Sequence, residues 1–389
     1  MKFGGRMLKS LVCSIFILVL IPSLACAQQY KQTNLVSDIA GMAPLTDPNL
    51  KNPWGLTRSS GSPWWVANNN SGTSTLYTGA GAAVLINGTG FVTVPPPGFA
   101  PGTQSTPTGV VFNGSTTDFL LKNGKSAHFI FATEDGTISA WATGPNAELE
   151  VDNSDKGSSH GAVYKGATSG EINGHKFLYV TNFHSGKVEV YDTTFKRVHL
   201  GEDAFRLDGD CDDDHGDGDN HHNCDNDRDR EGFAPFNIQN IGGSIFVTYA
   251  KQDATKHDDV AGAGLGFVEI FTPRGKHIGH LEHGDWFNAP WGVVWTTRDF
   301  GEFSNAILVG NFGSGWIAAF NGFTYKFEGF LKNPDDSTLT IDGLWSLTFG
   351  NDATAGPANT LFFTAGINDE ADGLFGTITP VNGLDGDEE

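Results

Sequence analysis

Six sequence repeats are the feature that most constrains the fold of this 389-residue chain. Their opening phrases start 54, 53, 75, 55 and 52 residues apart. Some twenty residues after each opening, two stretches that alternate apolar and polar residues flank a glycine turn, which predicts an antiparallel hairpin. No helical periodicity competes. The opening phrases are Pro53–Leu56, Pro107–Val110, His160–Val163, Pro235–Ile238, Pro290–Val293 and Asp342–Trp345.

A further short strand is predicted after several hairpins, as at Lys276–Leu281 and Tyr325–Leu331. Four antiparallel strands per repeat make the blade of a propeller. The sixth repeat lacks an outer strand, whereas Tyr30–Ser37 forms a strand without a repeat. Pairing the two would close the ring and leave no open sheet edge. The sequence therefore predicts an all-β, six-bladed β-propeller over residues 28–381, closed by the N-terminal strand, with an acidic tail at 382–389. The aromatic residues in the opening phrases are expected to pack between blades.

Residues 1–27 have the layout of a secretory signal peptide. Lys2, Arg6 and Lys9 precede an apolar run from Leu11 to Ile21, and Ala25-Cys26-Ala27 is a small-residue cleavage site. The run is too short to span a membrane, and no longer apolar run occurs. We therefore expect an exported protein, periplasmic or extracellular, without a membrane span.

The chain is strongly acidic. Its formal net charge is −21. Cleavage of the signal peptide would remove three positive charges and make the mature chain more negative. This charge disfavours nucleic acid and anionic membranes as partners and favours divalent cations or cationic or neutral ligands. We expect a monomer whose extracellular ligand or protein partner the composition does not name.

An acidic insertion at 202–231 makes the third repeat long. Residues 208–229 contain ten aspartates and three histidines, which cannot pack as a core. Aspartates at alternate positions resemble the opening of a calcium loop, although the glycine and closing glutamate of an EF-hand are out of register. Weak Ca²⁺ binding and a plain solvated loop both fit, and the histidines (His215, His221, His222) suit a transition metal. The predicted metal ligands are Asp208, Asp210, Asp212, Asp214, Asp217 and Asp219.

Cys211 and Cys224 are the two cysteines that remain after signal cleavage. In an oxidising compartment such a close pair is expected to form a disulfide. Closing a loop of this size would contribute about 3 kcal/mol.

Several phrases resemble known propeller families. Leu178–Tyr191 is similar to NHL-type and gluconolactonase-like propellers, whereas Phe233–Gly243, Tyr249–Asp253, Lys256–Gly264 and Asp342–Trp345 resemble an uncharacterised family of exported bacterial propellers. Some members of that family carry a PEP-type C-terminal sorting tag, and this chain ends without one, which predicts free release. The resemblance implies the fold over the whole mature chain but no chemistry.

The turns that open on one face of such a propeller surround its central channel. Asn68, Asn182 and Asn311 are assigned to equivalent positions in three repeats, and Glu134 to the same position in a fourth. Their oxygens suit a hard cation such as Ca²⁺, and gluconolactonase-like propellers hold a metal in this manner. That family's glutamate in the first loop is replaced by Asn52 and Trp54 here. The asparagines could equally cap their own turns.

Further polar loops on the same face are predicted to bind a ligand, supply a general base or metal ligands, or simply be hydrated. They contain His184, His257, Asp258, Asp259, Asp342, Asp369 and Glu370. No Gly-x-Ser-x-Gly motif stands in a strand-to-helix context, which disfavours serine-hydrolase chemistry. The leading hypothesis is an extracellular ligand-binding or protein-interaction module. The alternative is a divalent-metal-dependent hydrolase, lactonase-like, or a lyase with its site at the channel mouth.

Overall fold

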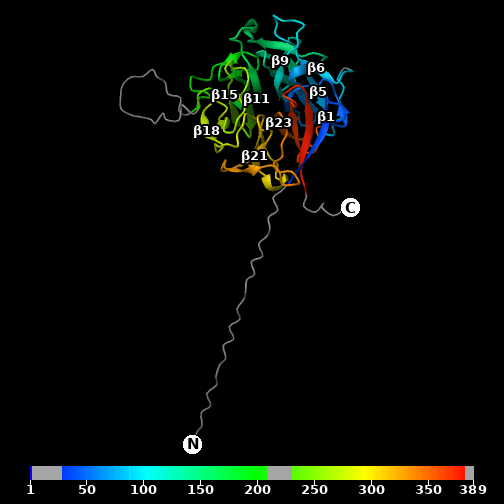
Figure 1. Cartoon of the computed structure of the whole chain (residues 1–389). Helices are drawn as coiled ribbons and strands as arrows, with labels where there is room; N and C mark the ends of the chain where they lie inside the picture. Colours follow the sequence, from blue (N-terminus) through cyan, green and yellow to red (C-terminus); the bar gives the residue numbers. More distant parts are fainter. Residues whose placement is uncertain (2–28, 87, 208–229, 382–389) are drawn as a thin grey trace, which may run out of the picture.

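Each repeat forms one small antiparallel sheet, and six such sheets follow one another round a central axis (Figure 1). The computed structural model describes residue 1 and residues 29–86, 88–207 and 230–381. The predicted six-bladed β-propeller is therefore confirmed. Among the described residues, no helix is long and apolar enough to cross a membrane.

The first three blades are sheets of four strands. Blade 1 comprises β3 (Pro53–Thr57), β4 (Trp64–Asn68), β5 (Thr73–Tyr77) and β6 (Phe91–Thr93). Blade 2 comprises β7 (Pro107–Phe112), β8 (Phe129–Thr133), β9 (Thr137–Trp141) and β10 (Glu148–Asp152). Blade 3 comprises β11 (Tyr164–Ile172), β12 (His175–Asn182), β13 (Lys187–Tyr191) and β14 (Arg197–Val198).

Blades 4 and 5 repeat this order. Blade 4 comprises β15 (Phe233–Ile241), β16 (Ser244–Lys251), β17 (Gly266–Phe271) and β18 (His277–His280). Blade 5 comprises β19 (Pro290–Trp295), β20 (Ala306–Asn311), β21 (Ile317–Asn321) and β22 (Phe327–Phe330). Single turns of 3₁₀ helix occur at η1 (Asn69–Ser71), η2 (Asp155–Gly157) and η4 (Gly301–Phe303).

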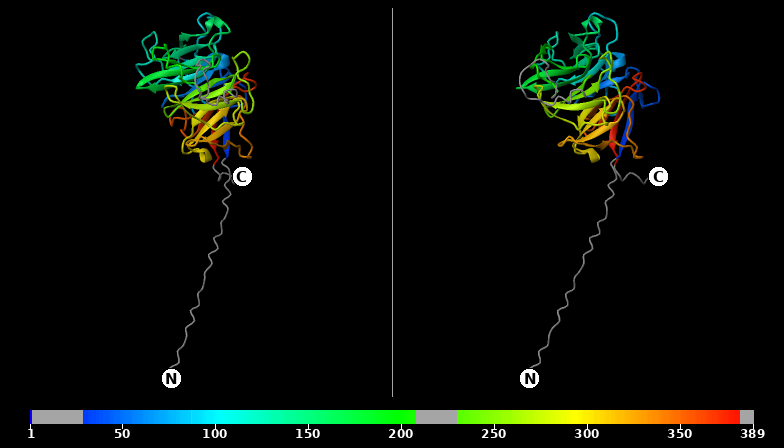
Figure 2. Two further views of the ribbon diagram at one scale, coloured as in Figure 1. Left: turned by 90° about the vertical axis from the view of Figure 1, so that its left-hand side faces the viewer. Right: turned by 60° about the vertical axis from the view of Figure 1, so that its left-hand side comes forward.

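Blade 6 joins the two ends of the described chain. It comprises β23 (Leu344–Phe349), β24 (Leu361–Ala365) and β25 (Leu374–Pro380), with β1 (Tyr30–Ser37) as outer strand and β2 (Leu45–Thr46) beside it. The antiparallel pairing of β1 with β25 runs from Tyr30 opposite Pro380 to Ser37 opposite Leu374. Figure 2 shows blue β1 and the red final strand side by side. The predicted closing strand is confirmed.

Apolar side chains form one buried cluster between each pair of neighbouring blades. Between blades 1 and 2, Trp65 stacks on Phe129 at 4.0 Å, and between blades 6 and 1, Trp64 packs on Phe362 at 4.8 Å. Each sheet is flanked by blades and buries both faces, and successive residues of a strand point to opposite faces, so Trp64 and Trp65 join the clusters on either side of blade 1.

A bulge interrupts the first strand of every blade where it pairs with the second. The position of the bulge shows that the predicted alignment of the repeats is wrong in the third and sixth units. Tyr164-Lys165-Gly166, not His160-Gly161-Ala162, corresponds to Pro53-Trp54-Gly55, and the sixth unit begins at Leu344 rather than Asp342. Two glycine-containing phrases lie close together in the third unit, so the sequence pattern alone favoured the wrong one.

Candidate functional site at the channel mouth

One side chain from the bulge of each blade faces the channel. The six residues at this position are Trp54, Thr108, Lys165, Phe236, Trp291 and Trp345. A glycine follows in four of the blades. A Cβ on Gly166 would lie 2.3 Å from the side-chain oxygen of Asn237 in the next blade, so the inner strands need glycine to approach this closely.

Four of these side chains are aromatic and fill the channel. Trp54 and Trp345 stack with ring centroids 3.5 Å apart, and Trp291 meets both edge-on at 6.0 Å. Phe236, from blade 4, lies 6.2 Å from Trp54 in blade 1. The rings therefore pack between neighbouring blades, as expected for Trp345 with Trp54 and Trp291, and also across the axis, where Phe236 meets Trp54.

Lys165 is the one charged member of the ring. Its side chain is 1% exposed, and its ammonium lies 5.0 Å from the Trp54 ring centroid and 5.7 Å from that of Phe183. The ammonium forms ion pairs with Glu134 and with Asp258, the latter at 3.5 Å. Burial acts to lower the pKa of Lys165, but the nearby carboxylates outweigh it and raise the pKa above its usual value. The site therefore contains a fixed positive charge.

Four carboxylates from three blades surround this ammonium: Glu134 between β8 and β9, Asp258 and Asp259 between β16 and β17, and Glu370 between β24 and β25. Two asparagines hold two of them in place. Asn69 donates to Glu134 at 2.6 Å, and Asn52 donates to Glu370 at 2.7 Å. Asn52 is itself oriented by the Trp345 indole, which donates to its oxygen at 2.9 Å.

The site holds more negative charge than Lys165 can neutralise. Burial, together with the charge of Glu370, raises the pKa of Asp259 to about 7. Burial also raises the pKa of Glu370, and the charge of Glu134 adds to this effect. Oδ2 of Asp259 is buried and has no hydrogen-bond partner among the described residues. Such a group is stabilised by a proton or by a cation.

His257 lies at the exposed side of the cluster. Its Nδ1 is 2.8 Å from Oδ1 of Asp258, and this contact raises the pKa of His257 and lowers that of Asp258 to about 2. Ligand atoms of Glu134, His257 and Asp258 lie within 4.8 Å of one another, so small side-chain movements would bring them to a shared metal ion. However, the Lys165 ammonium pairs with both of these carboxylates and would repel a hard cation there.

The three asparagines predicted as metal ligands bond within their own blades. Asn68 donates to Thr73 and Thr75, Asn182 donates to Glu189, and Asn311 accepts from the Asn288 amide at 2.8 Å. The register also places Thr133 at their position, so Glu134 corresponds to Asn69. Glu134 thus lies at the shared site, but one residue further along its blade than the position that the sequence predicted.

The other sequence-predicted ligand-binding residues divide into two groups. His257, Asp258, Asp259 and Glu370 come together around Lys165. Asp342 instead accepts a hydrogen bond from the backbone N–H of Asn368 at 2.9 Å and so caps the turn that begins at Asn368. Asp369 is exposed, and His184 is half-buried. The predicted insertion ligands Asp208–Asp219 and the Cys211–Cys224 disulfide lie outside the described residues.

Lys165 is the functional residue that the sequence reasoning missed. Its signal was present in the sequence. Aligned at Lys165-Gly166 with Trp54-Gly55, the third repeat would have shown a lysine where other repeats carry an aromatic residue.

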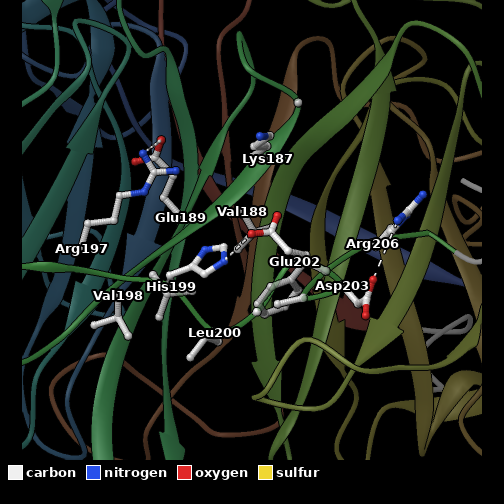
Figure 3. Close-up of a pocket in the computed structure, with 15 residues that line it drawn as sticks. Lys187, Val188, Glu189, Arg197, Val198, His199, Leu200, Glu202, Asp203 and Arg206 are labelled. Carbon is white, nitrogen blue, oxygen red and sulfur yellow. Dashed lines mark hydrogen bonds and ion pairs between the residues drawn. The ribbon is translucent and has the colours of Figure 1, made fainter. Parts of the chain in front are cut away.

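A separate hollow of about 770 Å³ lies outside the channel, between β13, β14 and the segment that leads to residue 207. Figure 3 shows that six of its charged or ionisable side chains turn toward one another in three pairs, whereas Lys187 stands apart. Arg197 pairs with Glu189 at 3.3 Å, His199 with Glu202 at 3.1 Å, and Arg206 with Asp203 at 3.8 Å. With these charges already paired, the hollow is a weaker candidate than the channel mouth.

Solved structures share the fold. A protein of unknown function from Bacteroides thetaiotaomicron matches with a TM-score of 0.51 and 9% identity, covering 91% of this chain and 77% of that one. A streptogramin B lyase matches with a TM-score of 0.46 and 12% identity, covering 91% and 98%. At these identities the likeness concerns the fold alone. No family model matches the chain.

Three sequence relatives come from Acanthamoeba polyphaga mimivirus. Uncharacterized protein R640 is 32% identical over 71% of this chain, which spans about half (48%) of that protein. Uncharacterized protein L690 is 25% identical over 90% of this chain and 85% of its own length. Uncharacterized protein R648 is 31% identical over 359 residues, 90% of this chain and 80% of its own length. The chain therefore belongs to the family of the mimivirus protein R648.

Proposed function

We propose that the protein is an exported ligand-binding module that takes a small, positively charged ligand at the acidic mouth of its channel. The observation that carries this proposal is the surplus of carboxylates around one fixed ammonium. Four carboxylates face Lys165, and Oδ2 of Asp259 has no partner among the described residues. A ligand cation would supply the missing positive charge.

The shape of the mouth favours a compact cation over a flat or apolar ligand. Below the carboxylates the channel is filled by Trp54, Trp291 and Trp345, so a ligand enters only as far as the acidic layer. Asp258 is 68% exposed, whereas Lys165 is inaccessible behind it. A primary amine or guanidinium group would therefore pair with Asp259 or Glu370, two carboxylates with which Lys165 forms no ion pair.

Calorimetric titration tests the proposal. The mature chain at pH 8 and low salt is titrated with 1,4-diaminobutane, and in parallel with CaCl₂. We expect the diamine to bind, and Asp259→Asn combined with Glu370→Gln to weaken binding at least tenfold. The matched control is Glu171→Gln, because Glu171 is an exposed carboxylate at the far end of β11. No heat with the diamine, or equal heat in the double variant, would contradict the proposal.

The alternative function is a divalent-metal-dependent hydrolase or lyase at the same mouth. The grouping of Glu134, His257 and Asp258 favours it, and Asp259, with a pKa of about 7, suits a general base. In the same titration, one tightly bound Ca²⁺ that is lost on Glu134→Gln, with no diamine binding, would replace the binding-module proposal by this one.

Export is proposed from residues 1–27 alone. The experiment is mass spectrometry of the secreted protein, whose first residue should be Gln28.

The same spectrum, recorded with and without reduction and alkylation, tests the proposed Cys211–Cys224 disulfide of the insertion. Repeating the Ca²⁺ titration with Asp208, Asp210 and Asp212 changed to Asn tests the proposed ion binding by the insertion.

A further inference from the structure

A second cluster of charged and metal-ligating side chains lies on the outer part of blade 4, away from the channel. Its centre is Glu269 in β17, whose side chain is 0% exposed. Carboxylates are rarely buried so completely unless several donors hold them. The donors here are one arginine and a set of histidines at three-residue spacing, His277, His280 and His283.

Nitrogen atoms approach both oxygens of Glu269. Nε2 of His277 lies 2.6 Å from Oε2. Oε1 lies 3.0 Å from the Arg230 guanidinium and 3.5 Å from Nε2 of His283. His280 is the residue directly opposite Glu269 on β18, and its ring centroid is 4.8 Å from that of His283.

A β-bulge brings the histidines to one face. In a regular strand, His277 and His280 would point to opposite faces, because they are three residues apart. On β18, however, Gly279 pairs with Ile270 and His277 with the adjacent Phe271, so Ile278 is an extra residue. Ile278 is 52% exposed, which fits a bulged position. Both histidines therefore lie on the face that carries Glu269.

The donor atoms of the cluster suit a transition metal, because the imidazoles of His280 and His283 lie beside the carboxylate of Glu269. Two imidazoles and one carboxylate are the ligand types of many zinc sites.

We propose that Glu269, His280 and His283 bind a divalent transition-metal ion of the Zn²⁺ class, with His277 as a supporting ligand or hydrogen-bond donor. One ligand atom from each of the three residues lies within 4.8 Å of the others. Zinc bonds of about 2.0–2.2 Å place neighbouring ligands of a tetrahedral ion about 3.4 Å apart. His280 and His283 are exposed and can rotate to close this gap.

Access and charge are compatible with this assignment. A hollow of about 510 Å³, lined in part by Arg230, His280, His283 and Asp285, opens beside the cluster and leaves room for a water as a further ligand. Arg230 is partly exposed (24%) and can withdraw from Glu269. Zinc affinity rests largely on imidazole donors, so a neighbouring positive charge hinders Zn²⁺ less than it hinders Ca²⁺ at Lys165.

The experiment is a titration of Zn²⁺ into the tag-free mature chain, with Co²⁺ as a spectroscopic probe. To remove competing histidines, the reference protein carries His215→Ala, His221→Ala and His222→Ala. We expect one equivalent of Zn²⁺ to bind, and Co²⁺ to give the visible absorption of a four-coordinate site. Adding His280→Ala and His283→Ala should weaken binding at least tenfold, because two of the three protein ligands are lost.

The matched control is the pair His160→Ala and His175→Ala, which removes two exposed histidines elsewhere. This control should bind as the reference does. Thermal melting verifies that every variant is folded. A third variant, Glu269→Gln, removes the carboxylate ligand, and the His280/His283 variant still decides the test if Glu269→Gln does not fold. Unchanged Zn²⁺ affinity in the His280/His283 variant, or binding that disappears with the three insertion histidines, would overturn the proposal.

Discussion

Lys165 at the channel mouth and Glu269 on blade 4 are both buried charges, 1% and 0% exposed, but their surroundings have opposite character. Lys165 is a cation among four carboxylates, so its site has a surplus of negative charge. Glu269 is an anion among an arginine and three histidines, so its site has a surplus of nitrogen donors. The first arrangement favours a ligand selected by charge, and the second favours one selected by donor atoms.

Replacing the buried lysine should have the largest effect. Lys165→Met leaves Glu134 without its counter-ion in the interior, and breaking a buried ion pair typically costs about 3–5 kcal/mol. Urea unfolding at pH 7 measures this loss, with Lys176→Met, a half-buried lysine of β12, as control. Adding Glu134→Gln should recover part of the stability. A loss no larger than that of the control would show that the ammonium is not needed in the channel.

The corresponding change on blade 4 should have a smaller, pH-dependent effect. Glu269→Gln removes charged hydrogen bonds and should cost about 1–3 kcal/mol at pH 7. The pKa of Glu269 is lowered from its usual 4.5, so its contribution is present above that pH and disappears as the pH falls through the folded-state pKa. The difference between the unfolding midpoints of the two proteins should therefore be larger at pH 7 than at pH 3. An equal difference at both pH values would contradict this assignment.

The channel mouth should show the opposite sign. The pKa of Asp259 is raised from 3.8 to about 7, so the folded state binds a proton more tightly, and stability falls as the pH rises between these values. Asp259→Asn removes this loss. Because Asp259 is partly exposed, we expect a gain of about 1–2 kcal/mol at pH 8 and none near pH 4. Denaturant unfolding at both pH values measures it, and a destabilised variant at pH 8 would refute the charge surplus.

The smallest effect should come from the exposed edge of the mouth. His257 and Asp258 are 47% and 68% exposed, and pairs of this kind contribute little to stability. His257→Asn should change the unfolding free energy by less than about 0.5 kcal/mol. It should nevertheless raise the pKa of Asp258 from about 2, since the His257 hydrogen bond is the largest cause of that low value. An NMR titration of the Asp258 carboxyl would detect this shift, and an unchanged pKa would exclude the contact.

The repeats and the closing strand could be predicted because they are local patterns. Period-two alternation specifies a strand within a few residues, and Tyr30–Ser37 forms β1 with the predicted bounds. The polar loops were also visible, and four of their acidic and histidine residues do meet at the mouth. The ion pairs of Lys165 with Glu134 and Asp258 were not visible, because 31 and 93 residues separate the partners in the chain.

The sequence by itself determined six blades, their order and the strand that closes them, because spacing and alternation are properties of neighbouring residues. Only the tertiary structure decided which side chains meet. The bulge in each first strand turned four aromatic residues and Lys165 into the channel, and the extra residue Ile278 turned His277 and His280 to one face. A shift of one residue reverses the face that every later side chain occupies, and in the third repeat two neighbouring glycine phrases competed for the position of that shift.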